Sequence, residues 1–136
     1  MKKRRIAEGD IYSVPLGDGL AAVCRVPFCS TYFKDLVQLS VFGKAVPDKS
    51  PLEQCAGVPI LQIFTGQDCA PSMGWTLLAS TPTTLEDERT SKRIVAGEVW
   101  IGDTPLGPVG SPDETLPKML VYGCALLRKT LIRTVA

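Results

Sequence analysis

The chain has 136 residues, of which 45% are hydrophobic and 21% are charged, and its formal net charge is +1. Such a composition is typical of a globular protein, and the length suffices for one domain with its own core. A net charge this close to zero excludes a global attraction to nucleic acid or to an anionic membrane. No apolar run approaches the roughly 20 residues that span a bilayer, so we expect no membrane contact. We predict a single domain over residues 1–136.

The first residues are basic, as in the first region of a secretion signal, but Glu8, Gly9 and Asp10 follow where such a signal has an apolar stretch. We therefore predict a cytoplasmic protein in which residues 1–7 form a flexible basic tail. A contact between this tail and nucleic acid is the alternative interpretation.

The cysteines are odd in number and include no Cys-x-x-Cys pair; they are Cys24, Cys29, Cys55, Cys69 and Cys124. The odd number and the absence of a recognisable signal peptide indicate reduced thiols. The sequence contains no histidine to complete a common zinc set. We therefore predict buried, apolar, reduced cysteines and no metal site.

Residues 9–26 predict a β-hairpin, because two strand-like runs flank the pair Asp18-Gly19. A tight hairpin turn needs positive φ angles, which aspartate and glycine tolerate. Alternation places Tyr12, Val14 and Leu16 on one face of the first run. Pro15 cannot donate a hydrogen bond to a neighbouring strand, so the first strand is expected to be an edge strand at least there.

Four further strands are expected between residues 36 and 101. Residues 36–42 alternate apolar and polar side chains, with Gln38 and Ser40 on the polar face, as in a half-buried strand. Residues 58–65 are apolar on both faces, which favours a central strand after Pro59. Residues 73–79 form a plausible strand, and residues 94–101 form another, with a bulge or bend at Gly97.

Gly/Pro-rich segments separate these strands. We expect a loop over residues 43–57, a turn over 66–72 and a long irregular loop over 102–117. Residues 80–93 are polar and form either an exposed loop or one short capped helix that starts near Thr84.

The end of the chain predicts a strand over residues 118–122 and a helix over 124–133. Four apolar residues recur there at helical spacing and would form one stripe along a helix: Leu120, Cys124, Leu127 and Leu131. Together the elements predict a mainly β domain (β-rich α+β): a small bent β-barrel or barrel-like antiparallel sheet with long Gly/Pro loops and one C-terminal helix.

The residues that commonly carry catalysis are missing or isolated. Without histidine no Ser-His-Asp triad can form, and there is no Gly-x-Ser-x-Gly motif or phosphate-binding glycine loop. We therefore predict no enzyme activity and no cofactor. A hydrolase that uses carboxylates or cysteine remains the third functional alternative.

Seven residues are candidates for contacts with a partner. They are five acidic and two tryptophan side chains: Glu86, Asp87, Glu88, Asp113, Glu114, Trp75 and Trp100. The acidic residues form either a solvated charged surface or a patch that docks a basic partner. Each tryptophan is either a core anchor or an interface residue. The aromatic residues Phe28, Tyr32 and Phe33 offer a stacking face for single-stranded nucleic acid, as a less favoured alternative.

Two blocks of sequence together resemble the immunity protein 26 family. The first contains Lys3-Arg4, the run Gly9 to Leu16, Asp18-Gly19 and a strand that ends in Arg25-Val26. The second is the closing segment Lys118 to Leu131. The resemblance implies a bacterial immunity protein, which binds its cognate toxin in the cytoplasm and blocks it, and which is not an enzyme.

The leading functional hypothesis is thus a bacterial immunity protein that neutralises a cognate polymorphic toxin by occlusion. The expected contacts are the loop 102–117 and the acidic residues near Glu86. A small barrel that binds nucleic acid or another ligand is the alternative. The expected partner is a protein toxin, with no membrane and no nucleic acid.

Overall fold

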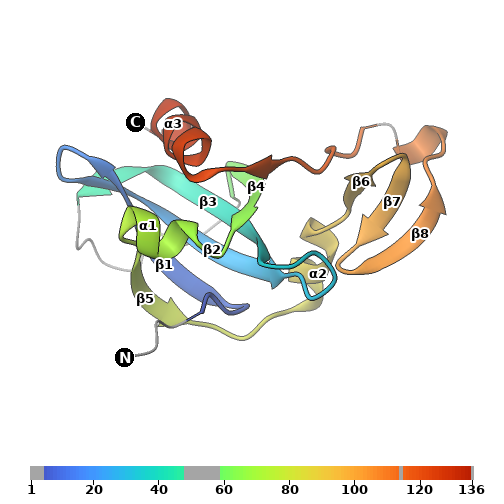
Figure 1. Ribbon diagram of the computed structural model, residues 1–136, viewed down its shortest axis with the longest axis horizontal. Coiled ribbons are helices and arrows are strands. Elements are labelled where there is room, and N and C mark those ends of the chain that lie inside the picture. Colours follow the sequence, from blue (N-terminus) through green and yellow to red (C-terminus); the bar gives the residue numbers. More distant parts are fainter. Residues whose placement is uncertain (1–4, 48–58, 114, 136) are drawn as a thin grey trace.

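The computed structural model describes residues 5–47, 59–113 and 115–135, which form two β-sheets and three helices (Figure 1). The larger sheet has the strand order β5-β1-β2-β3-β4-β9. Its strands are β1 (Asp10–Gly17), β2 (Leu20–Cys29), β3 (Leu36–Pro47), β4 (Leu61–Gly66), β5 (Thr76–Ser80) and β9 (Val121–Tyr122). The smaller sheet consists of β6 (Arg93–Val95), β7 (Glu98–Ile101) and β8 (Thr104–Pro108). The helices are α1 (Cys69–Met73), α2 (Leu85–Thr90) and α3 (Cys124–Val135).

The predicted class, mainly β with a C-terminal helix, is confirmed. All paired strands are antiparallel except β4 and β9. The larger sheet is open rather than closed into a barrel, because β5 and β9 lie at opposite edges.

The predicted hairpin is confirmed as β1 and β2. Asp18 and Gly19 occupy the turn with φ angles of 56° and 75°. Positive φ angles are the reason why aspartate and glycine are favoured at these positions. Strand β5 pairs with β1 only over Asp10 to Ser13, so β1 is an edge strand at Pro15, as expected from its missing N–H.

Helices α1 and α3 cover one face of the larger sheet (Figure 1) and close the main core. Leu127 and Leu131 are fully buried there, as the helical stripe predicts. Leu120, the first residue of that stripe, is instead 65% exposed. It precedes the helix in an extended segment, so it does not share the helical face.

The opposite face of the larger sheet is also covered, which corrects the prediction of a half-buried strand at residues 36–42. Gln38 is 1% exposed and Ser40 is 4% exposed. The Gln38 amide donates hydrogen bonds to Gln62 Oε1 and to the carbonyl of Thr90, at the end of α2, each at 2.8 Å. Polar side chains on this face are therefore buried because residues far along the chain pack over them.

Residues 93–117 fold differently from their prediction. The expected strand 94–101 is a hairpin of β6 and β7, whose turn holds Ala96 and Gly97 at φ angles of 50° and 82°. A positive φ angle at both central residues makes a tight turn rather than a bulge. The expected irregular loop 102–117 contains β8, which pairs with β7, and a 3-10 turn at Ser111–Asp113.

The remaining segments follow their predictions in part. Residues 43–47 extend β3, and residues 48–58 lie outside the described residues. Helix α1 begins within the expected turn 66–72, so the strand expected at 73–79 starts only at Thr76. The helical alternative for residues 80–93 is confirmed, because α2 begins after Thr84 with a complete capping box.

The prediction of a flexible basic tail over residues 1–7 is corrected for residues 5–7. Ile6 is 4% exposed, and its backbone N–H and C=O both bond the side chain of Gln67. Arg5 forms an ion pair with Asp35 at 2.7 Å. These contacts dock the segment 5–7 on the domain, and residues 1–4 lie outside the described residues.

The prediction of reduced cysteines is wrong for one pair. Cys69 and Cys124, the first residues of α1 and α3, form a disulfide with a Cα–Cα distance of 5.3 Å. The pair is 55 positions apart, so no local pattern indicates it. Cys24 is buried, Cys29 is free and half-buried, and Cys55 lies outside the described residues.

Candidate functional site

The smaller sheet projects away from the body formed by the larger sheet and its helices (Figure 1). Its outer strand β8 has one neighbour, β7, and is an edge strand. On this strand Leu106 is 56% exposed. An exposed apolar residue on an unpaired strand edge is a feature of docking surfaces.

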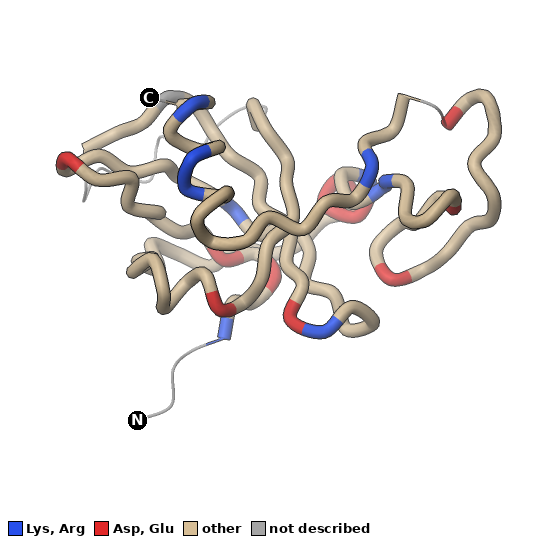
Figure 2. The backbone as a smooth tube through the Cα atoms, turned by 45° about the horizontal axis from the view of Figure 1, so that its top comes forward, with Lys and Arg blue, Asp and Glu red and all other residues tan. Residues whose placement is uncertain are grey.

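Acidic residues lie along the smaller sheet and basic residues along α3 (Figure 2). Within residues 93–113 the only cation is Arg93, which is fully buried, whereas Glu98, Asp103 and Asp113 are acidic. Helix α3 carries the basic residues Arg128, Lys129 and Arg133 and no acidic residue. The projecting sheet therefore carries an excess of acidic residues away from the junction, and α3 carries basic residues without acidic ones.

Asp103 attaches the smaller sheet to the larger. Its carboxylate accepts hydrogen bonds from the hydroxyl groups of Ser30 and Thr31 and from the backbone N–H of Thr31, at 2.5 to 2.9 Å. Burial raises the pKa of Asp103, but these hydrogen bonds outweigh burial and hold the pKa below its usual value. The carboxylate therefore stays charged and fixes the turn between β7 and β8 against the end of β2.

Trp100 forms a second attachment. Its ring lies 5.2 Å from that of Tyr32 and 5.3 Å from that of Phe33, measured between centroids. Trp100 is only 8% exposed, whereas Tyr32 is 67% exposed. Of the two interpretations of Trp100, the structure favours the packing anchor.

Arg93 is the third attachment and lies where the two sheets meet. Its guanidinium carbon is 5.5 Å from the ring centroid of Phe28 and 5.1 Å from that of Phe64. Nη1 donates to the carbonyls of Ser91 and Gly102, at 3.1 and 2.6 Å. Burial lowers the pKa of Arg93, and the charge of Asp103 opposes this shift.

A short extended segment, residues 117–122, joins both sheets, and we call it the strap. The backbone of Ile94 in β6 bonds Pro117 and Met119, each at 2.8 Å, and Val121 pairs with Phe64 in β4. One stretch of chain thus hydrogen-bonds to an edge of each sheet.

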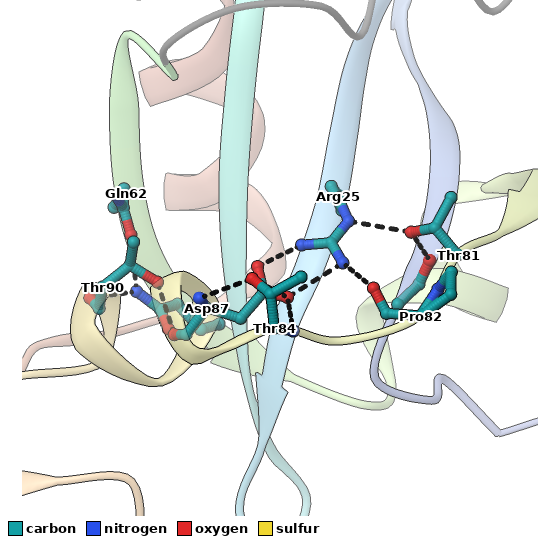
Figure 3. Close-up of polar contacts among 9 residues, drawn as sticks. Arg25, Gln62, Thr81, Pro82, Thr84, Asp87 and Thr90 are labelled. Carbon is teal, nitrogen blue, oxygen red and sulfur yellow. Dashed lines mark hydrogen bonds and ion pairs between the residues drawn. The ribbon is translucent and has the colours of Figure 1, made fainter.

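Asp87, predicted as part of an exposed acidic patch, is instead buried and paired (Figure 3). Arg25 of β2 forms a two-pronged ion pair with its carboxylate. Arg25 also donates to Thr81 Oγ1 and to the carbonyl of Pro82, each at 2.9 Å. The same carboxylate accepts from the backbone N–H of Thr84 at 2.7 Å and completes the capping box of α2. Asp87 therefore anchors α2 to the larger sheet and is not available to a partner.

We expect the substitution Asp87→Asn to lower the free energy of unfolding by about 2 kcal/mol, because it leaves the partly buried Arg25 guanidinium without its counter-charge. Burial raises the pKa of Asp87, but hydrogen bonds from Arg25 and Thr84 outweigh burial and lower it. A lowered pKa stabilises the fold above the unfolded-state value of about 3.9, and this stability is lost as the pH falls through the folded-state pKa.

Urea unfolding at pH 7 and again below pH 4 measures both effects. The difference between wild type and Asp87→Asn should shrink at the lower pH. The matched control is Glu88→Gln on the exposed side of the same helix, which should change stability little. Equal stabilities of Asp87→Asn and this control at pH 7 would contradict the assignment.

The other candidate residues are not brought into one cluster by any contact among the described residues. Glu86 and Glu88 are exposed on α2, where Glu86 lies 3.7 Å from Arg89. Asp113 is half-buried and accepts a hydrogen bond from Gly110. Trp75 is half-buried and packs on Tyr12 at 5.5 Å between ring centroids. Glu114 lies outside the described residues.

Cys69, Cys124 and Cys29 offer no activated nucleophile. Cys69 and Cys124 lie with Asp68 in a group that has metal-ligand spacing, but their sulfur atoms are bonded to each other. Burial, together with the charges of Glu8 and Asp10, raises the pKa of Cys29 to about 12. At neutral pH Cys29 is therefore a neutral thiol, which is a poor nucleophile.

A cavity of about 160 Å³ at the sheet junction was not expected from the sequence. It lies between β3 and β4, the segment from α2 to β6, and the strap. Its polar lining includes Gln38, Thr90, Lys92, Arg93 and Lys118. These residues belong to separate elements, so no sequence motif places them together.

Comparisons of this chain with protein-family models, with curated proteins and with solved structures find no match. The resemblance to the immunity protein 26 family therefore stays a prediction. Among the described residues, no helix has the length and apolar character needed to cross a membrane.

Proposed function

We propose that this protein is a bacterial immunity protein that binds a cognate protein toxin in the cytoplasm and occludes its active site. The observation that carries the proposal is the projecting smaller sheet, which combines acidic surface charge with the exposed Leu106 on an unpaired edge strand. The family resemblance supplies the class of partner.

The chemistry of this surface favours a basic partner. A toxin that attacks nucleic acid carries positive charge around its active site, because its substrate is a polyanion. Exposed acidic groups such as Glu98 attract such a surface and raise the rate of association. Leu106 and the free edge of β8 then offer an apolar contact and main-chain hydrogen bonds.

The rigidity of the attachment supports occlusion as the mechanism. Asp103, Trp100 and Arg93 hold the smaller sheet to the larger one through hydrogen bonds and ring packing. A surface that is already ordered loses little entropy on binding.

The test uses the toxin encoded beside this gene, expressed with and without the full chain. We expect protection of the cell and direct binding of the purified pair. The double substitution Glu98→Lys/Asp113→Lys should slow association about tenfold or more, because it reverses the charge of the docking surface. The matched control Lys129→Glu/Arg133→Glu reverses charges on α3 and should leave the association rate of a folded protein close to wild type or higher.

Circular dichroism of each variant separates misfolding from lost binding. Absence of protection and of binding by the wild-type chain would overturn the proposed function. Equal losses in both charge-reversal variants would overturn the assignment of the smaller sheet as the contact surface.

A further inference from the structure

The junction cavity concentrates positive charge. Lys92, Arg93 and Lys118 line it, and no Asp or Glu stands among the described residues of its lining. The carboxylate that acts on Arg93 electrostatically, Asp103, is bonded to residues 30–32 at the turn between β7 and β8. Like charges gathered in one place repel each other, and an anion bound among them relieves that repulsion.

Two buried polar atoms of the lining residues have no hydrogen-bond partner among the described residues. They are Nη2 of Arg93 and Oε1 of Gln38. The other nitrogens of Arg93 are engaged, Nε with Met119 Sδ and Nη1 with two carbonyls. Buried polar groups nearly always find a partner, so a donor and an acceptor left unpaired at one cavity indicate a missing group.

The orientation of the Gln38 amide is fixed. Its Nε2 donates to two acceptors, Gln62 Oε1 and the Thr90 carbonyl, so exchanging the amide oxygen and nitrogen would break both bonds. The unpaired atom is therefore an acceptor, and its partner must carry a hydrogen. A ligand that suits the whole cavity combines negative charge with a hydrogen-bond donor.

We propose that this cavity binds a protonated phosphate group, either free hydrogen phosphate or a phosphate monoester. Its charged oxygens accept hydrogen bonds from Arg93, Lys92 and Lys118, and its P–OH group donates to Gln38 Oε1. Binding is reversible and breaks no covalent bond. The cavity volume of about 160 Å³ is several times the roughly 30 Å³ that one water molecule occupies, so a tetrahedral oxyanion fits. Lys118 is exposed, which places the entrance at the strap.

The contrast between phosphate and sulfate tests the proposal most sharply. Both are tetrahedral oxyanions of similar size, but sulfate carries no proton at neutral pH and cannot donate to Gln38 Oε1. Isothermal titration of the full chain with each anion, at pH 7 and equal ionic strength, should give an affinity at least tenfold higher for phosphate.

Variants of Lys92 and Lys118, which line the cavity without being buried, test the proposal without changing the buried Arg93 and Gln38. The double substitution Lys92→Gln/Lys118→Gln leaves Arg93 and Gln38 in place and should weaken phosphate binding at least tenfold. The matched control Lys129→Gln/Arg133→Gln removes two charges from α3 and should bind phosphate like wild type. An amide resonance of the Gln38 side chain that shifts on titration would locate the bound anion.

A further arm with methyl phosphate distinguishes the two sources of the ligand. The second pKa of a phosphate monoester is about 6, so at pH 7 most of it lacks the proton and its binding should strengthen as the pH falls towards 6. Three results would each overturn the proposal: equal affinity for phosphate and sulfate, unchanged phosphate binding by Lys92→Gln/Lys118→Gln, or no saturable binding at roughly 10 mM phosphate. Bound water would then be the partner of Arg93 Nη2 and Gln38 Oε1. None of these results depends on toxin binding.

Discussion

Reduction of the Cys69–Cys124 disulfide is expected to lower the free energy of unfolding by about 4 kcal/mol. The bond closes a loop of 55 positions, and the chain-entropy model assigns about this value to a crosslink of that length. The crosslink restricts the unfolded chain more than it adds contacts to the folded one. It joins the start of α1 to the start of α3, the two helices that cover the main core.

Urea unfolding with and without dithiothreitol measures this difference. The control is the variant Cys69→Ser/Cys124→Ser, which cannot form the disulfide. Its free energy of unfolding should equal that of the reduced wild type, with or without dithiothreitol. An equal midpoint for the reduced and oxidised wild-type protein would contradict the prediction. The measurement also bears on the proposed compartment, because cytoplasmic thiol systems reduce most disulfides.

The reduced protein is expected to stay folded. Leu127, Leu131 and Val135 remain buried against the larger sheet and keep α3 in place without the crosslink. Burial of side chains of this type is worth about 1.5 to 3 kcal/mol each. The reduced form therefore keeps the fold at lower stability than the oxidised form.

The parts of the fold that the sequence predicted are those that local physics determines. The hairpin of β1 and β2 follows from Asp18-Gly19, because the turn angles select the residue types. The capping box of α2 follows from Thr84 and Asp87, three positions apart. Each of these features depends on residues that are neighbours in the chain.

The parts that sequence reasoning missed depend on distant partners. Gln38 looks like the solvent face of a strand, but Thr90, 52 positions away, accepts its hydrogen bond and covers it. Asp87 belongs to an acidic run, and only Arg25, 62 positions away, shows that its carboxylate is an internal anchor. The same limit applies to the junction cavity, whose lining comes from β3, β4, β6 and the strap.

The smaller sheet was missed for a different reason. Gly97 is compatible with a bulge or a turn, and the choice between them depends on whether a second strand follows. Pro105 and Pro108 made the following segment look irregular, yet proline is tolerated on an edge strand such as β8. Because both the glycine and the proline signals were ambiguous, the sequence did not predict the smaller sheet, on which the proposed function depends.

The substitution Arg93→Ala is expected to lower the free energy of unfolding by about 4 kcal/mol. Arg93 is fully buried, and its guanidinium fills the space between Phe28 and Phe64. Truncation leaves a cavity there and removes the donor from the carbonyls of Ser91 and Gly102. Large-to-small substitutions in a core cost about 2 to 5 kcal/mol, and an orphaned polar group adds about 1 to 3 kcal/mol.

Two further variants separate volume from hydrogen bonding. Arg93→Met refills the space without charge and should recover part of the loss, because it also removes the cost of burying a cation. Arg93→Lys keeps the charge but cannot place donors on two carbonyls and pack flat between two rings, so it should recover less. The exposed control Arg133→Ala should change the stability by no more than about 0.5 kcal/mol.

In a Trp75→Phe background, tryptophan fluorescence in the urea titration reports on the junction, because the remaining tryptophan, Trp100, packs beside it on Tyr32 and Phe33. If Arg93 holds the two sheets together, Arg93→Ala should shift the fluorescence transition and the circular-dichroism transition to lower urea, with fluorescence the first to change. A stability of Arg93→Ala equal to that of Arg133→Ala would mean that the rings of Phe28 and Phe64 close over the gap. The smaller sheet would then be held by Asp103, Trp100 and the strap, without a contribution from Arg93.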